Sequence, residues 1–332
     1  MSEAKRVLII DYAWPTIDIE REIITKAGGE VLVSSTGEQN ELIELAPPVT
    51  AIMSNWRPLR APVIEVATKC QVIARYGVGV DNIDVAAATK HGIVVTNVPD
   101  YCMDEVSNEA MAMLLCGARG ILKFDRSVRS GVWDVKLGMP LFRLKGLTLG
   151  IIGFGRIGKT VAPKAQGFGL QVIAYDPYID QQEMTQRNVK PVDLDTLLRT
   201  SDFVTIHTPM TPETNKMIGE EALRKMKPTA WLINTARGGV VDTVALAAAL
   251  REGRLAGAGL DVLPQEPPPK DEFLNLPNVI FTPHSAFYSE GSLQELQAKA
   301  AQRVAEVLQG KVPSNIVNPA VLQQPNCRLH SR

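Results

Sequence analysis

Residues 147–158 read Leu-Thr-Leu-Gly-Ile-Ile-Gly-Phe-Gly-Arg-Ile-Gly. The apolar residues at the start of this run predict a buried strand, and residues 157–168 have the pattern of a helix. A second apolar run at residues 172–175 follows that helix and ends next to Asp176. This order of strand, glycine turn, helix, strand and carboxylate is typical of a unit that binds a dinucleotide. A strand-to-helix turn that binds nothing is the alternative.

Each residue type in this run suits one part of a dinucleotide. Gly153 permits the tight turn, Gly155 lets the backbone approach a pyrophosphate, and Gly158 lets the helix pack against the strand. The first turn of the helix offers free N–H groups and the positive end of its dipole to the phosphates. Asp176 is placed to accept hydrogen bonds from the ribose hydroxyls. It favours NAD over NADP, because a carboxylate repels a 2′-phosphate and no arginine follows it at positions 177 and 178.

The composition is that of an ordinary globular protein. The chain has 332 residues, of which 45% are hydrophobic and 21% charged, and its formal net charge is −1. This length predicts about two domains, and this charge favours neither a nucleic acid nor a membrane as partner. We expect no signal peptide and no membrane span, because no apolar run is long enough. The four cysteines show neither a Cys-x-x-Cys spacing nor a histidine cluster, so we expect no metal site, reduced thiols and a cytoplasmic location.

Short apolar runs alternate with helical patterns along the whole chain. We expect strands at residues 7–10, 31–33, 51–53, 72–74 and 93–95, and a second set at 149–152, 172–175, 203–207, 231–234, 257–261 and 279–282. Long helices are expected at about 105–122 and 289–308, followed by an irregular tail whose last six residues are frayed. This alternation predicts an α/β protein with two doubly wound parallel sheets. Ligands of such sheets bind beyond the carboxyl ends of the strands.

Three strand ends of the second set carry groups suited to catalysis. Arg237 follows residues 231–234, Glu266 follows 257–261, and His284 follows 279–282. Histidine can transfer a proton near neutral pH, and a paired carboxylate would orient it and favour its protonated form. Arginine can bind a carboxylate with two hydrogen bonds and polarise a carbonyl. A surface charge, a loop histidine and a solvated acid are the alternatives, and spacing alone leaves both interpretations open.

At these residues the chain resembles the D-isomer-specific 2-hydroxyacid dehydrogenase family. The resemblance covers about residues 7–317. Its motifs are Tyr-Gly-Val-Gly-Val-Asp-Asn-Ile-Asp at 76–84, Thr-Asn-Val-Pro at 96–99, the glycine run, Asn-Thr-Ala-Arg-Gly-Gly at 234–239, Leu-Asp-Val at 260–262 with Glu-Pro at 266–267, and Thr-Pro-His at 282–284. It implies a flavodoxin-like substrate domain formed by residues 1–103 and 287–332, into which a Rossmann NAD-binding domain of residues 104–286 is inserted. It also implies a homodimer built on the NAD-binding domain.

The resemblance implies roles for individual residues. Arg237 anchors the substrate carboxylate and keto oxygen, His284 donates the proton, and Glu266 pairs with His284. The backbone N–H groups of Val78 and Gly79 bind the same carboxylate, although a plain glycine turn is the alternative. Besides the glycines and Asp176, the implied contacts to NAD come from Arg156 and Ile157 at the pyrophosphate, from His207, Thr208, Pro209 and Thr214 near the adenine, and from Thr235, Ala236 and Asp261 at the nicotinamide.

The chain departs from many family members near the expected substrate. The run His-Ser-Ala-Phe-Tyr-Ser-Glu at residues 284–290 resembles the branch of the C-terminal-binding corepressors and their bacterial dehydrogenase relatives, with Phe287 where the corepressors have Trp. Arg57 and Arg60 could bind a phosphorylated substrate, with a solvated charge pair as the alternative. Four aromatic side chains could line an apolar pocket or belong to the core: Trp14, Trp56, Tyr101 and Phe287.

The resulting prediction is an NAD-dependent oxidoreductase that interconverts a small 2-oxo acid and its D-2-hydroxy acid. The substrate would be of the hydroxypyruvate, glyoxylate or phosphoglycerate type, so the protein would be phosphoglycerate dehydrogenase-like. The alternative is an interaction protein that senses NAD(H), like the corepressors. The absence of a long C-terminal extension from this sequence favours the enzyme.

Overall fold

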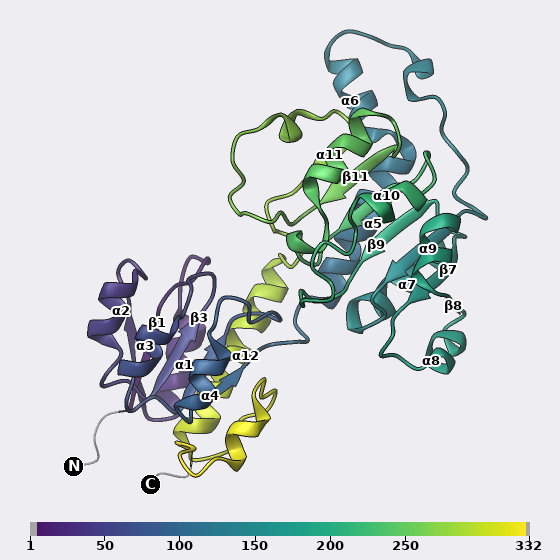
Figure 1. Ribbon diagram of the computed structural model, residues 1–332. Helices are drawn as coiled ribbons and strands as arrows, with labels where there is room; N and C mark the ends of the chain where they lie inside the picture. The colour runs from purple at the N-terminus through teal and green to yellow at the C-terminus, as the bar shows by residue number, and fades with distance from the viewer. Residues whose placement is uncertain (1–4, 330–332) are drawn as a thin grey trace. The chain divides into compact units, whose positions relative to one another are not determined.

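The computed structural model describes residues 5–329, which form two compact units (Figure 1). Of the described residues, unit 1 comprises 5–101 and 289–329, and unit 2 comprises Cys102–Tyr288. The chain thus leaves unit 1 once and returns to it after completing unit 2. Among the described residues, no helix is both long and apolar enough to span a membrane.

Unit 1 contains a five-stranded parallel sheet with the strand order β2-β1-β3-β4-β5, which is the order of flavodoxin-like folds. Helices cover both faces of such a sheet, and the middle of β1 is accordingly fully buried. The strands are β1 (Lys5–Ile9), β2 (Gly29–Val33), β3 (Ala51–Ser54), β4 (Val72–Arg75) and β5 (Val94–Thr96). The helices are α1 (Asp18–Lys26), α2 (Gln39–Leu45), α3 (Ala61–Val66), α4 (Val85–Lys90) and α12 (Glu290–Leu308), and α12 packs against α1 and β4.

The chain after α12 has little regular structure, as expected, but polar contacts hold it along β5. The side chain of Asn318 accepts a hydrogen bond from the N–H of Val95 (2.8 Å) and donates one to the carbonyl of Ile93 (3.0 Å). A short 3-10 helix, Pro319–Gln323, follows. Cys327 is buried, and the N–H of Arg328 donates to the carbonyl of Gly92 (2.9 Å). The expected frayed end is therefore wrong for residues 327–329, and residues 330–332 lie outside the described residues.

Unit 2 contains a seven-stranded parallel sheet with the order β12-β11-β10-β9-β6-β7-β8. This is the Rossmann order with one further strand, so the predicted fold class is confirmed. The strands are β6 (Thr148–Ile152), β7 (Gln171–Tyr175), β8 (Lys190–Pro191), β9 (Phe203–Ile206), β10 (Trp231–Asn234), β11 (Gly257–Leu260) and β12 (Val279–Phe281). The helices are α5 (Met103–Arg119), α6 (Ile121–Arg129), α7 (Arg156–Gly167), α8 (Gln181–Gln186), α9 (Leu194–Thr200), α10 (Glu220–Lys225) and α11 (Thr243–Arg251), with 3-10 turns at Val135–Gly138, Gly238–Val240 and Glu272–Asn275.

The first long helix differs from the expected single helix at about residues 105–122. Gly120 adopts a left-handed conformation (φ 60°) and ends α5, and α6 begins at Ile121. Glycine is favoured at this position because it lacks the Cβ that penalises positive φ. The final helix begins at Glu290, because the side chain of Ser289 caps it by accepting a hydrogen bond from the N–H of Ser292.

Candidate active site

The glycine turn joins β6 to α7 and leaves the start of that helix open. Gly153 has a φ of +89°, and a Cβ there would lie 2.7 Å from the carbonyl carbon of His207. A Cβ on Gly158 would lie 2.4 Å from the carbonyl oxygen of Gly153. Both positions therefore require glycine, whereas a Cβ on Gly155 would meet no described heavy atom within 4 Å. Gly155 precedes the first turn of a 12-residue helix, whose N–H groups and dipole suit a phosphate.

Asp176 lies beside this turn, directly after β7. Its carboxylate accepts hydrogen bonds from the N–H groups of Phe154 (2.8 Å) and Tyr178 (2.9 Å). A carboxylate can accept about four hydrogen bonds, so these two leave capacity for ribose hydroxyls. The structure thus brings Asp176 together with Gly153 and Gly155.

The ends of β9 and β10 present buried polar atoms that no described residue satisfies. They are Nδ1 of His207 and Oγ1 of Thr235. Burial lowers the pKa of His207 well below its ordinary value, so its ring is neutral at pH 7. Buried polar atoms without a protein partner call for an explanation, and a polar ligand bound at these strand ends would supply one. The residues of this edge therefore fit a dinucleotide.

The remaining predicted cofactor residues lie on the same unit. Arg156 and Ile157 are the first two residues of α7, and Thr208 and Pro209 follow β9. The hydroxyl of Thr214 donates to the carbonyl of Pro209 (2.7 Å), so it supports the loop after β9. Ala236 follows β10, and its N–H donates to the side chain of Asn234 (3.0 Å).

The structure brings His284 and Glu266 into direct contact in unit 2. Nδ1 of His284 lies 2.6 Å from Oε2 of Glu266, whose Oε1 accepts a hydrogen bond from the N–H of Leu263 (2.9 Å). Burial raises the pKa of Glu266, but His284, the N–H of Leu263 and the charge of Arg237 outweigh it and lower the pKa below its ordinary value. Because Nδ1 is engaged by a carboxylate, Nε2 is the ring nitrogen suited to carry a proton to a ligand.

Arg237 and Phe287 complete this cluster. Arg237 follows β10; its Nη1 donates to the carbonyl of Ala236 (2.7 Å), and its own carbonyl accepts from the side chain of Asn234 (2.9 Å). The ring of Phe287 meets the ring of His284 edge to face, with centroids 6.4 Å apart. Arginine, histidine and carboxylate from three strand ends can together bind an anion and exchange a proton with it.

Asp261 holds the loop that carries His284. It is 2% exposed, and its carboxylate accepts hydrogen bonds from the hydroxyl of Thr282 (2.6 Å) and the N–H groups of Ser285 (2.8 Å) and Ala286 (3.1 Å). Its carbonyl accepts from the N–H of His284 (2.8 Å), which has a φ of +53°. A left-handed conformation costs a non-glycine residue about 1–2 kcal/mol. Asp261 offsets this cost, a supporting role the sequence did not reveal; its contact to the nicotinamide stays a prediction.

Glu109 is a further residue that sequence reasoning missed. It lies on α5 and is half-buried close to Thr282 and Asp261. Burial and the charge of Asp261 raise its pKa. No motif marks it, and only the packing of α5 beside β11 reveals it.

The predicted substrate residues Val78, Gly79 and Arg57 lie in unit 1. The carbonyl of Val78 accepts a hydrogen bond from the side chain of Asn97 (2.6 Å), and the carbonyl of Gly77 accepts one from the N–H of Val98 (2.9 Å). These two contacts hold the loop after β4 in place. Arg57 forms an ion pair with Glu38, with Nη1 and Oε1 2.8 Å apart. Among the aromatic candidates, Trp14 and Tyr101 are buried in the core, whereas Trp56 is 41% exposed.

Comparisons with known proteins agree with this geometry. Residues 111–286 match the model of the D-isomer specific 2-hydroxyacid dehydrogenase, NAD binding domain. A glyoxylate reductase from Korarchaeum cryptofilum is 45% identical over 270 residues, which are 80% of this chain and 81% of that protein. A D-3-phosphoglycerate dehydrogenase from Methanocaldococcus jannaschii is 40% identical over 294 residues, which are 87% of this chain and 56% of that protein. The structure of D-lactate dehydrogenase from Aquifex aeolicus, complexed with NAD and lactic acid, has a TM-score of 0.85 at 28% identity and covers 94% of this chain and 99% of that one.

The chain therefore belongs to the D-isomer-specific 2-hydroxyacid dehydrogenase family. It is an NAD-dependent oxidoreductase, and NAD is its cofactor. Both points confirm the sequence-based predictions.

Proposed function

We propose that this enzyme interconverts a small 2-oxo acid and its D-2-hydroxy acid. The observation that carries the proposal is the 2.6 Å contact between His284 and Glu266, with Arg237 close enough to influence the pKa of Glu266. All three lie on the unit that carries the glycine turn and Asp176. The names of the similar glyoxylate reductase and D-3-phosphoglycerate dehydrogenase support this substrate class.

In the proposed reaction, each residue has a distinct task. Arg237 binds the carboxylate and polarises the keto group with its guanidinium. For unit 1, the N–H groups of Val78 and Gly79 remain the proposed donors to the substrate carboxylate. When bound, NADH supplies the hydride for the keto carbon. His284 delivers a proton from Nε2 to the keto oxygen, and Glu266 holds the ring in the orientation that this transfer needs.

The test is the oxidation of NADH with glyoxylate, hydroxypyruvate, 3-phosphohydroxypyruvate, pyruvate and phenylpyruvate. We expect turnover of at least one acid, and a loss of about 10²- to 10⁴-fold in kcat for His284→Ala, the usual contribution of a positioned general acid. NADH binding and the melting temperature of the variant serve as controls for its fold. Equal background rates for wild type and variant with every acid would refute the proposal. Capture of a partner protein controlled by NAD(H), without turnover, would favour the interaction protein instead.

We also propose that the chain forms a homodimer through unit 2. Figure 1 shows α6 and the loop after it projecting from the rest of this unit. This segment exposes many apolar side chains, and exposed apolar patches mark interaction surfaces. The most exposed are Ile121, Val128, Trp133, Val135, Met139 and Phe142.

The oligomeric state in solution tests this second proposal. Trp133→Asp should convert a dimer into a monomer in light scattering coupled to size-exclusion chromatography. Tyr178→Asp is the matched control, because Trp133 and Tyr178 are both 89% exposed in unit 2. A monomeric wild type, or equal dissociation of both variants, would refute a dimer built on this segment.

A further inference from the structure

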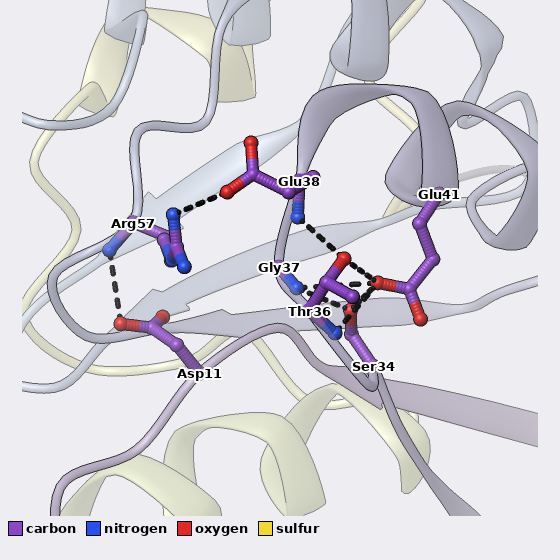
Figure 2. A network of polar contacts seen from close by, with 7 residues as sticks. All are labelled: Asp11, Ser34, Thr36, Gly37, Glu38, Glu41 and Arg57. Atoms are coloured by element: carbon purple, nitrogen blue, oxygen red, sulfur yellow. Dashed lines mark hydrogen bonds and ion pairs between the residues drawn. The ribbon is translucent and has the colours of Figure 1, made fainter.

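A network of polar contacts joins three strand ends at the carboxyl edge of the sheet in unit 1 (Figure 2). Asp11 follows β1, residues 34–38 follow β2, and Arg57 follows β3. The carboxylate of Asp11 accepts hydrogen bonds from the N–H groups of Asn55 (2.8 Å) and Arg57 (2.9 Å). The loop that carries Arg57 is therefore held in place by hydrogen bonds from its backbone N–H groups to Asp11.

The guanidinium of Arg57 is held by Glu38, as Figure 2 shows, at 2.8 Å. Gly37 has a φ of +66°, and a Cβ there would lie 3.0 Å from Cγ of Arg57, so glycine leaves room for the arginine stem. The segment before Glu38 is fixed by Glu41, which accepts from the hydroxyl of Ser34 (2.6 Å) and the N–H of Thr36 (2.9 Å). The pair thus joins two ordered loops.

The same network reaches the loop proposed to bind the substrate carboxylate. The side chain of Asn82 donates to the carbonyls of Asn55 (3.0 Å) and Arg57 (3.1 Å). Asn82 belongs to the 76–84 motif that contains Val78 and Gly79. Within unit 1, the arginine loop and the proposed substrate loop are therefore parts of one polar framework. A substituent on the acid would meet the Arg57–Glu38 pair if it extends along this edge.

The ion pair with Glu38 changes which ligands the guanidinium of Arg57 favours. A guanidinium without a counter-charge is a strong ligand for phosphate, because it offers two parallel hydrogen bonds and a full charge. Here a carboxylate already holds it, and the two side chains are 46% and 66% exposed, so an incoming ligand can reach both. A phosphate would be repelled by Glu38 and would have to displace it. An uncharged substituent would not be repelled by Glu38 and would not have to displace it from Arg57.

We infer that Glu38 is a specificity-determining residue, which by pairing with Arg57 selects against phosphorylated acids and makes the substrate an unphosphorylated 2-oxo acid. The inference rests on the proposed function. It favours the alternative in which Arg57 does not bind a substrate phosphate, and it assigns the exclusion of phosphate to Glu38, a residue that no motif marks.

Hydroxypyruvate and 3-phosphohydroxypyruvate test the inference, because they differ only by the phosphate. Wild type should have the higher kcat/KM for hydroxypyruvate. Glu38→Gln should raise kcat/KM for 3-phosphohydroxypyruvate about tenfold, the effect of removing one charge about 5 Å from a dianion in water. The value for hydroxypyruvate should stay within about twofold, since an exposed ion pair contributes little. Adding Arg57→Gln to Glu38→Gln should abolish the gain.

Glu30→Gln is the matched control. Glu30 pairs with Arg6 (3.8 Å), their side chains are 59% and 46% exposed, and both lie near the amino-terminal ends of β2 and β1. Glu30→Gln changes the net charge by the same amount as Glu38→Gln. It should nevertheless leave the ratio of kcat/KM for 3-phosphohydroxypyruvate to that for hydroxypyruvate unchanged. The inference is overturned if wild type prefers the phosphorylated acid, if Glu38→Gln leaves the ratio unchanged, if the gain survives Arg57→Gln, or if Glu30→Gln reproduces it. If wild type turns over no acid at all, the proposed function itself fails, and this result precedes any comparison of variants.

Discussion

The two units share a doubly wound topology, but their first strand-to-helix turns are built in opposite ways. In unit 2, β6 passes through Gly153 and Gly155 directly into α7, and the space at Gly155 is open. In unit 1, residues 10–17 separate β1 from α1, and Trp14 within them is buried. The indole of Trp14 donates to Glu20 (3.1 Å), which is fully buried in the first turn of α1. Protein side chains thus fill the first turn of unit 1, whereas the first turn of unit 2 is open at Gly155.

This difference shows that the topology supplies a ligand edge, whereas the residues of the turn decide whether a dinucleotide can use it. Burial raises the pKa of Glu20, and two donors, Trp14 and Tyr76, converge on one of its oxygens. Such a packed acid serves the core of unit 1. Polar atoms of His207 and Thr235 in unit 2 are buried without a described partner, as is the second carboxylate oxygen of Glu20. The turns themselves differ, because a Cβ on Gly155 would meet no described heavy atom within 4 Å.

The largest expected difference between the two units is in the loss of kcat/KM when the arginine at each sheet edge is replaced. Arg237→Ala should lower kcat/KM for the preferred acid by about 10²- to 10⁴-fold, because two charge-assisted hydrogen bonds of about 1.5–3 kcal/mol each are lost. Arg57→Ala should cost less than about fivefold with an unphosphorylated acid, since an exposed pair contributes about 0–1 kcal/mol. Steady-state kinetics at saturating NADH measure both. Equal losses would contradict the functional difference between the two edges.

A smaller effect is expected from closing the open turn of unit 2. Gly155→Ala should weaken NADH binding about 10- to 100-fold, because its Cβ would hinder the approach of the backbone to the pyrophosphate and weaken charge-assisted hydrogen bonds. Gly167→Ala is the matched control, since it is on the same helix and also has no described heavy atom within 4 Å of its added Cβ. Fluorescence titration measures binding, and thermal unfolding should show that neither variant loses stability. Unchanged NADH affinity in Gly155→Ala would argue against the turn as the pyrophosphate site.

The acids after β7 and β1 provide a further contrast. Asp176→Asn should raise the ratio of kcat/KM with NADPH to that with NADH about tenfold, because the charge that repels a 2′-phosphate is removed. Asp11→Asn removes an equal charge from a carboxylate that accepts N–H groups of residues 55–57, so it should lower thermal stability and leave the cofactor ratio unchanged. A change in the ratio with Asp11→Asn would show that net charge, and not position, governs the preference.

The sequence was sufficient to predict the features that local patterns determine, namely the strands and the polar residues that follow them. Gly153 and Asp176 stand at fixed positions around two buried strands, and Arg237 and His284 each follow a strand of a parallel sheet. Hydrophobic periodicity locates those strands, and parallel pairing brings their carboxyl ends to one edge. The end of α5 at Gly120 was missed because the apolar pattern continues into α6.

Contacts between distant loops could not be predicted in the same way. Glu38 lies 19 residues from Arg57, and Asn318 lies 223 residues from Val95. No pattern links such positions, because only the packed fold sets their distance. The left-handed conformation of His284 and its support by Asp261 likewise depend on the arrangement of β11 and β12.

The smallest predicted effect concerns two carboxylates whose pKa values lie below the ordinary one for different reasons. Hydrogen bonds from Ser34 and Thr36 lower the pKa of Glu41 in unit 1. For Glu266 in unit 2, burial raises the pKa, but the contact with His284 and its neighbours outweighs that effect. A carboxylate with a lowered pKa in the folded state stabilises the protein above its unfolded pKa, and this contribution is lost as the pH falls through the folded pKa.

Glu41→Gln and Glu266→Gln should therefore both have a lower free energy of unfolding than wild type at pH 7. The gap should narrow as the pH falls below about 4.5, because the carboxylates of the unfolded chain then become protonated while those of the folded protein, with their lowered pKa values, stay charged. Urea titrations between pH 3 and 7 measure this, and kinetics separate the two cases. Glu41→Gln should keep the kcat of wild type, because its partners lie within one loop of unit 1, whereas Glu266→Gln should alter the dependence of kcat on pH through His284. If Glu41→Gln altered that dependence equally, the polar network of unit 1 would share in the proton transfer, and the assignment of this chemistry to unit 2 would be wrong.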